Sequence, residues 1–175
     1  MTLLILILII IGMVVGFRRG GLLQGLHFIG TLAAVIIARL NYKTLGSKLE
    51  LIMPYPSSAL EVENTLLKQI PDLENAYYYM AAFFFIFIVT KLIIQLLISS
   101  FDYLQQIQFN FLVSSIVGLV FGMLEIIYIL AVVLAFAATI PMDALQGAID
   151  GSGLAKVILN HTFIISGRLM DWMQI

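Results

Sequence analysis

The chain has 175 residues, of which 62% are hydrophobic and only 11% are charged, and its mean hydropathy is +1.08. Soluble domains have roughly 45–50% apolar and about 25% charged residues, so this excess of apolar side chains has to face lipid. The net charge is −1 without large basic or acidic blocks, which argues against nucleic acid as a partner. The sequence has no cysteine, which excludes disulfides, a thiolate nucleophile and a cysteine-based metal site.

Four apolar stretches have about the length that a membrane-crossing helix requires. The hydrocarbon core of a bilayer is about 30 Å thick, and a helix of about 20 apolar residues spans it. The predicted crossings are residues 2–17, 21–38, 76–98 and 111–140. The sequence therefore predicts an all-α polytopic protein: a four-helix transmembrane domain over 1–140, which includes an extramembrane linker over 41–75, and a C-terminal tail over 141–175.

The first crossing carries no charge and ends at Arg18 and Arg19. A cleaved signal peptide is the alternative interpretation of this stretch. It lacks a basic segment before the apolar run and an Ala-x-Ala-like site after it, and three further apolar stretches follow. We therefore expect it to remain in the membrane.

The remaining crossings differ in the polar residues that they carry. In the second, Gln24, His27 and Thr31 lie three and four residues apart and share one helix face. The third begins with tyrosines 77–79, which suit a membrane interface, and has Lys91 as its single charge. The fourth has Glu125 as its single charge.

The tail after Pro141 has an amphipathic pattern. Apolar residues at helical spacing are Leu154, Val157, Ile158, Ile165, Leu169 and Trp172, and the opposite side carries Lys156, Asn160, Gly167 and Asp171. This pattern predicts a C-terminal helix that lies in the membrane interface.

Glycines four residues apart predict where the crossings pack. The candidate packing residues are Gly12, Gly16, Gly20, Gly25, Gly118 and Gly122. Small residues at this spacing form a groove in which two helix backbones can approach, although glycine is also simply common in transmembrane helices. The third crossing has no such pattern, and its Phe83, Phe84, Phe85 and Phe87 are expected to face lipid or another copy of the chain.

Ionisable residues inside membrane helices are costly and by default suggest function. If the Arg18-Arg19 turn and the link over 99–110 lie on one side, then His27, Lys91 and Glu125 lie roughly 9, 10 and 14 Å from that membrane edge, at 1.5 Å per residue. They could therefore meet in one intramembrane polar layer, which Gln24 and Gln95 extend toward that side.

Each member of this layer also has a simpler interpretation. Lys91 can reach the headgroups along its apolar stem, and His27 can be a neutral core histidine that bonds a carbonyl. The short side chain of Glu125 cannot reach the headgroups from its depth, so Glu125 is either protonated or paired with a positive charge.

The distribution of basic residues leaves the orientation open. Arg18 and Arg19 in a tight turn favour a cytoplasmic turn and termini outside the cytoplasm, since short loops and the first helix dominate orientation. That orientation also places Lys43, Lys48, Lys68, Lys156 and Arg168 outside, against the same rule.

Short motifs in a fixed order connect the chain to a known family. They are Gly16-Phe17-Arg18-Arg19-Gly20, Leu22-Leu23-Gln24 with His27, Ala38-Arg39-Leu40 with Tyr42, Met53-Pro54-Tyr55-Pro56, then Asn110, Gly118, Gly122 and Glu125, and His161-Thr162 with Asp171-Trp172. With these motifs the chain resembles the CvpA family, the colicin V production proteins, and specifically its Bacillus-type members.

The resemblance implies a small bacterial inner-membrane protein with four crossings, associated by name with production and export of a toxin. Some relatives carry a trypsin-like protease after the fourth helix that works outside the cytoplasm. This implies an extracytoplasmic C-terminus, which agrees with the orientation that Arg18 and Arg19 favour, and hence both termini outside.

The sequence lacks the residues of a recognisable enzyme. It has two histidines and no His-Glu-x-x-His or Gly-x-Ser-x-Gly pattern, so we expect no catalysis, cofactor or metal site. Two hypotheses are left open. The first is a membrane scaffold or accessory factor for export or envelope maintenance, which binds a membrane or envelope protein or a second copy. The second is a small oligomeric transporter or channel that uses the polar layer.

Overall fold

The computed structural model describes residues 1–56, 72–101, 103 and 110–162. Helices in this part of the chain are α1 (Thr2–Arg19), α2 (Gly21–Leu49), α3 (Leu73–Ser99), α4 (Phe111–Ala138), α5 (Asp143–Asp150) and α6 (Gly153–His161). The helices α1 to α4 are long and apolar enough to cross a membrane. The prediction of an all-α fold with four candidate membrane-spanning helices is confirmed.

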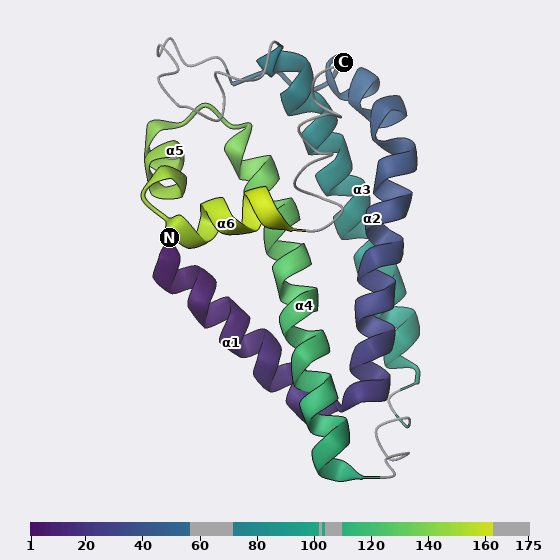
Figure 1. Ribbon diagram of the computed structural model, residues 1–175. Coiled ribbons are helices and arrows are strands. Elements are labelled where there is room, and N and C mark those ends of the chain that lie inside the picture. The colour runs from purple at the N-terminus through teal and green to yellow at the C-terminus, as the bar shows by residue number, and fades with distance from the viewer. Residues whose placement is uncertain (57–71, 102, 104–109, 163–175) are drawn as a thin grey trace.

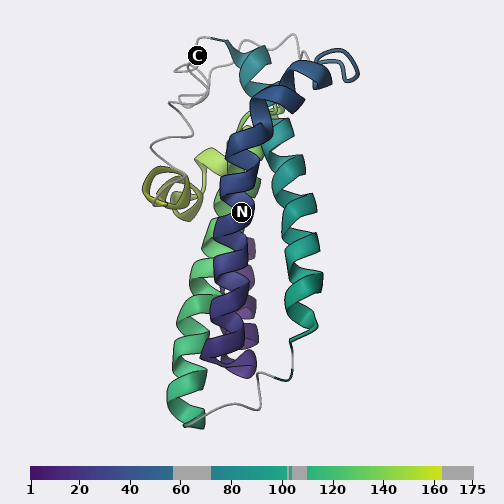
Figure 2. The same ribbon diagram turned by 90° about the vertical axis from the view of Figure 1, so that its right-hand side faces the viewer.

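The helices α2, α3 and α4 run roughly along one common direction, and α1 is inclined to them (Figure 1). The turn between α1 and α2, the end of α3 and the start of α4 lie together, and we call this the turn end of the bundle. At the opposite end lie the end of α2, the start of α3 and the end of α4. Figure 2 shows α2 between α4 and α3, and α2 packs extensively on both, whereas α3 and α4 contact each other much less.

Local sequence explains where the helices begin. Gly20 joins α1 to α2 with a φ of 82°, a conformation that favours glycine. Asp72 accepts a hydrogen bond from the Asn75 backbone N–H, Asn110 from those of Leu112 and Val113, and Ser152 from that of Ala155. These are N-caps, which satisfy backbone donors that the first helical turn leaves free. The bonds from the Asn75 backbone and side chain also lower the pKa of Asp72.

The helix α2 continues to Leu49, well past the predicted crossing over residues 21–38. The first part of the predicted linker is therefore helical, and it packs on the start of α3. A Cβ added at Gly46 would lie 3.0 Å from Cε1 of Tyr79, and Tyr42 meets the same ring edge to face. The linker residues 57–71 lie outside the described part of the chain.

The aromatic residues of α3 are more buried than expected. Phe83 and Phe87 are 2% and 0% exposed, and the ring of Phe84 stacks on Phe136 with centroids 4.8 Å apart. Phe85, which is 49% exposed, is the one of the four that faces outward. The prediction that all four face lipid or another copy of the chain is wrong for Phe83 and Phe87, because a helix that is apolar all round gives no signal of which face is buried.

The tyrosines at the start of α3 are also packed inside the protein. Tyr77 and Tyr78 are 7% and 3% exposed, and the ring of Tyr77 contacts those of Phe136 and Tyr55. Tyr77 and Tyr78 thus pack between helices at the opposite end of the bundle, and their place at the level of a membrane interface stays a prediction.

The contrast between Phe87 and Phe85 gives a stability prediction. We expect Phe87→Ala to destabilise the protein by about 3–5 kcal/mol, because a buried ring leaves a cavity. Phe85→Ala is the matched control on the same helix, and it should change the midpoint of thermal unfolding in detergent much less. Equal effects of the two substitutions would contradict the buried position of Phe87.

The C-terminal part of the described chain contains two short helices, α5 and α6, where the sequence predicted one C-terminal helix. The helix α6 lies across α4 (Figure 1) and also contacts α1, whose Thr2 hydroxyl lies 2.9 Å from that of Ser152. Ala155 and Ile158 are buried, whereas Val157 is 54% exposed.

The predicted apolar face of this tail is thus only partly the buried one: Ile158 packs on the bundle, whereas Val157 faces outward. Lys156, on its other side, pairs with Asp150 at 3.4 Å. The place of this helix in the membrane interface stays a prediction. Residues 163–175, with the predicted positions Ile165, Gly167, Leu169, Asp171 and Trp172, lie outside the described residues.

Candidate functional site

A group of buried polar residues lies between α2, α3 and α4. We call it the polar cluster, and its members are Gln24, His27 and Thr31 of α2, Lys91 of α3 and Glu125 of α4. Their exposures range from 0% to 8%. The three α2 residues share one helix face because they lie three and four residues apart. Lys91 and Glu125 reach this face from the two helices that flank α2.

Lys91 and Glu125 form an ion pair inside the bundle. The Lys91 ammonium also donates to the Thr31 hydroxyl at 2.6 Å and to the backbone carbonyl of His27 at 3.3 Å. An ammonium has three N–H donors, and three oxygens accept from it here. Lys91 is therefore satisfied within the protein and does not extend to the headgroups.

The Glu125 carboxylate receives donors on both of its oxygens. Its Oε1 accepts from Lys91 and from the Thr31 hydroxyl, the latter at 3.1 Å, and its Oε2 accepts from the Gln24 side-chain amide. The Thr31 hydroxyl also lies 3.0 Å from the His27 carbonyl oxygen. Both carboxylate oxygens of Glu125 therefore have hydrogen-bond partners within the protein.

Arg19, which the sequence analysis used only to set topology, also contacts this group. Its Nη1 donates to Oε1 of Gln24 at 3.4 Å, so Gln24 bridges the end of α1 and the carboxylate of α4. Sequence reasoning missed this contact, and it missed Thr31 as a member of the site although Thr31 lay on the same helix face.

The other predicted members of the polar layer take different positions. His27 contributes its backbone carbonyl to the cluster, and its side chain is 1% exposed. Gln95 is partly exposed, and its backbone carbonyl accepts from the Ser99 hydroxyl at 2.9 Å. Among the described residues, no hydrogen bond joins the Gln95 side chain to the cluster.

The glycines bring α1 and α4 into backbone contact beside the cluster. A Cβ added at Gly16 would meet the Gly118 carbonyl and lie 3.0 Å from Cα of Gly122. One added at Gly118 would lie 3.0 Å from Cα of Gly20, and one at Gly122 would lie 3.1 Å from the carbonyl carbon of Gly12. We call these five residues the glycine seam.

Gly25 differs from the glycine seam, because its nearest neighbour is the Phe121 ring at 3.4 Å, an ordinary contact. Arg18, at the turn end, is exposed.

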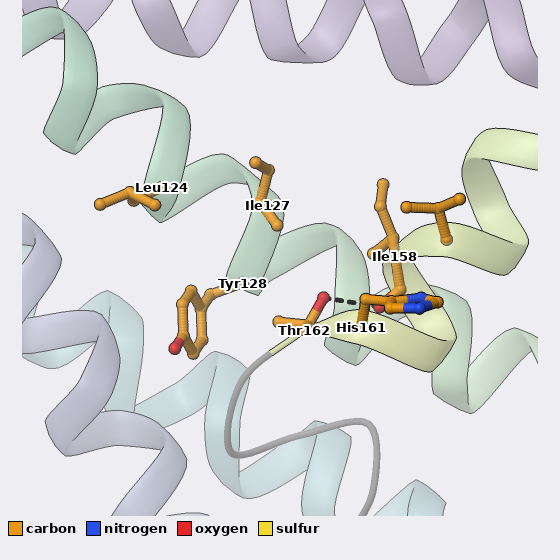
Figure 3. A pocket seen from close by; sticks show the side chains of 7 residues that line it. Leu124, Ile127, Tyr128, Ile158, His161 and Thr162 are labelled. Atoms are coloured by element: carbon orange, nitrogen blue, oxygen red, sulfur yellow. Dashed lines mark hydrogen bonds between the residues drawn. The ribbon is translucent and has the colours of Figure 1, made fainter.

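A further feature is an apolar pocket of about 320 Å³ between α4 and α6 (Figure 3). It is lined by Leu124, Ile127, Tyr128, Val157, Ile158, His161 and Thr162. The Thr162 hydroxyl donates to the Ile158 carbonyl at 2.6 Å and so adds little polarity.

The part of the chain that the structure describes contains no group of three or more acidic or histidine residues able to hold a metal ion. At the centre of the polar cluster is the ion pair between Lys91 of α3 and Glu125 of α4. Both charged groups also form hydrogen bonds with α2. Since leaving either charge uncompensated in this setting is costly, the pair holds α3 and α4 to α2.

These features define an integral membrane protein with four candidate spans, a glycine-packed helix pair and an internal ion pair. The model of the Colicin V production protein family matches residues 1–162, and the chain belongs to this family. It is 33% identical to the uncharacterized transmembrane protein YshB of Bacillus subtilis strain 168, over 99% of this chain and 98% of that protein. No solved structure matches the chain significantly.

Proposed function

We propose that the protein is a scaffold or accessory factor of the bacterial cell membrane, without catalytic activity of its own. The observation that carries this proposal is the closure of the polar cluster. Lys91 and Glu125 are 7% and 8% exposed, and their polar atoms bond one another and α2. A charge pair saturated in this way serves to fix helices together rather than to bind and release a passing solute.

Membership in the family suggests the cellular process in which this scaffold acts. The family is named for colicin V production, so we place the chain in production or export of a toxin, or in envelope maintenance. The partner is a membrane or envelope protein, or a second copy of the chain. Apolar residues of α1 and α3 such as Leu3, Leu92 and Leu96 are 74%, 58% and 72% exposed, which leaves surface for lipid and for such a partner.

The alternative function is a small oligomeric transporter. It is favoured by the presence of three ionisable residues, His27, Lys91 and Glu125, within candidate membrane spans. A flux assay separates the two functions. Purified protein in liposomes should give no solute or ion flux above that of empty liposomes, and the variant Lys91→Leu/Glu125→Leu should still complement a deletion strain in cells. Flux that this double variant abolishes while it remains folded would overturn the scaffold proposal in favour of transport.

The proposal includes an orientation, with the turn end in the cytoplasm and both termini outside it. The absence of native cysteine makes single-cysteine labelling direct. Leu51→Cys, at an 86% exposed position near the opposite end, should react with an impermeant thiol reagent on intact cells. Ser100→Cys, exposed at the turn end, should react only after lysis. The reverse pattern would overturn this orientation.

A further inference from the structure

The helix α6 lies deep along the bundle rather than beside the end of α4. With Leu124, Ile127 and Tyr128 of α4 it forms the pocket of Figure 3. Tyr128 precedes the end of α4 at Ala138 by ten residues, which is about 15 Å at 1.5 Å per residue. The residues between them are all apolar, and the hydrocarbon core of a bilayer is about 30 Å thick. The pocket therefore lies about half the thickness of the core below the apolar end of α4.

The start of α1 indicates a similar depth. The Thr2 hydroxyl lies 2.9 Å from that of Ser152, the N-cap of α6. The helix α1 has 18 residues and is about 27 Å long at 1.5 Å per residue. Because it is inclined to the other long helices (Figure 1), its extent along the bundle is shorter still, and less than the thickness of the core. A flat bilayer would thus rise above the start of α1 on this side of the protein.

The outer face of α6 is polar at this depth. Asn160 and His161 are exposed, and the ion pair between Lys156 and Asp150 leaves 44% and 30% of these two side chains exposed. Exposed charged and polar groups are costly in hydrocarbon, and a bilayer responds by local thinning that brings headgroups and water to them. A span shorter than the core is accommodated in the same way. Both the short α1 and the polar face of α6 therefore favour a thin bilayer here.

We propose that the bilayer is thinned where α1 and α6 lie, and that a phospholipid from the leaflet at the opposite end binds there. Its phosphate accepts hydrogen bonds from the side-chain amide of Asn160 and from a ring N–H of His161, and one of its acyl chains occupies the pocket. Lys156 lies one turn from Asn160 and adds positive charge, which Asp150 partly offsets. The negative phosphate matches these donors.

The occupant follows from where the pocket opens. Val157, which is 54% exposed, and His161 form its outer rim, whereas Ile158 and Thr162 are buried. At this depth the surroundings of the rim are lipid. A largely apolar pocket of about 320 Å³ with a polar group at its rim suits an acyl chain that leads to a headgroup.

A control for the depth of α6 is available on α3, which α2 separates from α4 (Figure 2). A Cβ added at Gly30 of α2 would lie 2.6 Å from Cγ2 of Ile94 on α3. Gly30 lies two residues after Phe28, whose ring centroid is 5.8 Å from that of Tyr128 in the pocket. Ile93, next to Ile94, is thus at a level similar to that of α6.

Thinning is tested by the depth of a fluorescent label on single cysteines, in vesicles of phosphatidylglycerol. The chain has no cysteine of its own, and Val157 and Ile93 are both 54% exposed. The label on Val157→Cys should be quenched at least about twofold more by a nitroxide on the lipid headgroup than by one near the end of the acyl chain. The label on Ile93→Cys should show the reverse order. Equal ratios at the two positions, or a Val157→Cys label quenched mainly from the chain end, would overturn the thinning.

The phosphate contact is tested by adding Asn160→Leu/His161→Leu to the labelled Val157→Cys protein. Quenching by the headgroup nitroxide should fall by at least about half. Asn41→Leu, which removes an exposed amide of α2, should leave it unchanged. All three positions are exposed, so circular dichroism should show an unchanged helix content. Undiminished quenching in the leucine variant would overturn the contact. So would a label that iodide quenches from water and the headgroup nitroxide does not, because water alone would then cover α6.

The acyl chain is tested with Val157→Trp, which fills the mouth of the pocket, and with Val120→Trp, at a 44% exposed position of α4 outside it. In native mass spectra of protein released from phosphatidylglycerol nanodiscs, the wild type and Val120→Trp should retain one lipid. Retention by Val157→Trp should be at least about threefold lower. Equal retention by all three, or none by the wild type, would overturn the pocket as a lipid site. A scaffold and a transporter both lie in lipid, so these results are independent of the proposed function.

Discussion

Gly122→Leu is expected to separate α1 from α4 and to destabilise the bundle by about 3 kcal/mol or more, at or above the upper end of ordinary overpacking. A Cβ at this position would lie 3.0 Å from Cα of Gly16 and 3.1 Å from the carbonyl carbon of Gly12. Both neighbours are backbone atoms, which cannot rotate aside as a side chain does. The helices must move apart, and without a hydrophobic drive between helices in lipid, close packing is what holds them.

A second glycine gives a control of opposite sign. A Cβ at Gly147, within α5, would meet nothing within 4 Å, so Gly147→Ala should stabilise the protein slightly, by up to about 1 kcal/mol, through helix propensity. Gly122→Ala already brings the clash and should lower the midpoint of thermal unfolding in detergent. Equal midpoints for Gly122→Ala and Gly147→Ala would show that the glycine seam does not hold α1 to α4.

The sequence was sufficient to predict the four apolar helices, because their length and composition are dictated by the bilayer. Depth along the helices placed His27, Lys91 and Glu125 at similar levels, with Gln24 about one turn nearer the turn end. The structure brings the side chains of Gln24, Lys91 and Glu125 together, whereas His27 contributes its backbone carbonyl. This works because membrane helices are straight and roughly parallel, so a residue's distance from the helix end fixes its level. Gln95, four residues from Lys91, lies on nearly the same helix face but one turn nearer the end of α3. There it is partly exposed, and its side chain does not join the cluster.

The orientation of α3 about its own axis could not be predicted from the sequence, because every face of this helix is apolar. Phe83 and Phe87 face the core and Phe85 faces outward, and no difference in polarity separates them. In soluble helices the polar face reveals the buried one, and lipid removes that contrast.

The end of α2 was not predicted correctly, for a different reason. Residues 39–49 are too polar for a crossing, and a method that reads hydropathy ends the segment where the lipid contact ends rather than where the helix does.

Lys91→Leu and Glu125→Leu are expected to destabilise the protein strongly as single changes and much less when combined. Removal of one partner from a buried ion pair costs about 3–5 kcal/mol, because the other charge remains without compensation. Lys91→Leu should be the more harmful, since the short side chain of Glu125 cannot reach the membrane surface from its depth. The stem of Lys91 is long enough to turn its ammonium toward the headgroups when Glu125 is absent.

The double variant should recover most of this stability because it strands no charge, and the cost that remains is the Gln24 amide N–H, which loses Glu125 as its acceptor. The Thr31 hydroxyl still reaches the His27 carbonyl, and the Gln24 amide oxygen still accepts from Arg19. Two leucines are buried at this level of the bundle without stranding a charge. Thermal unfolding of the wild type, both single variants and the double variant in detergent gives the coupling energy directly. If the two single effects simply add, Lys91 and Glu125 do not stabilise each other, and α2, α3 and α4 are held together by the hydrophobic core instead.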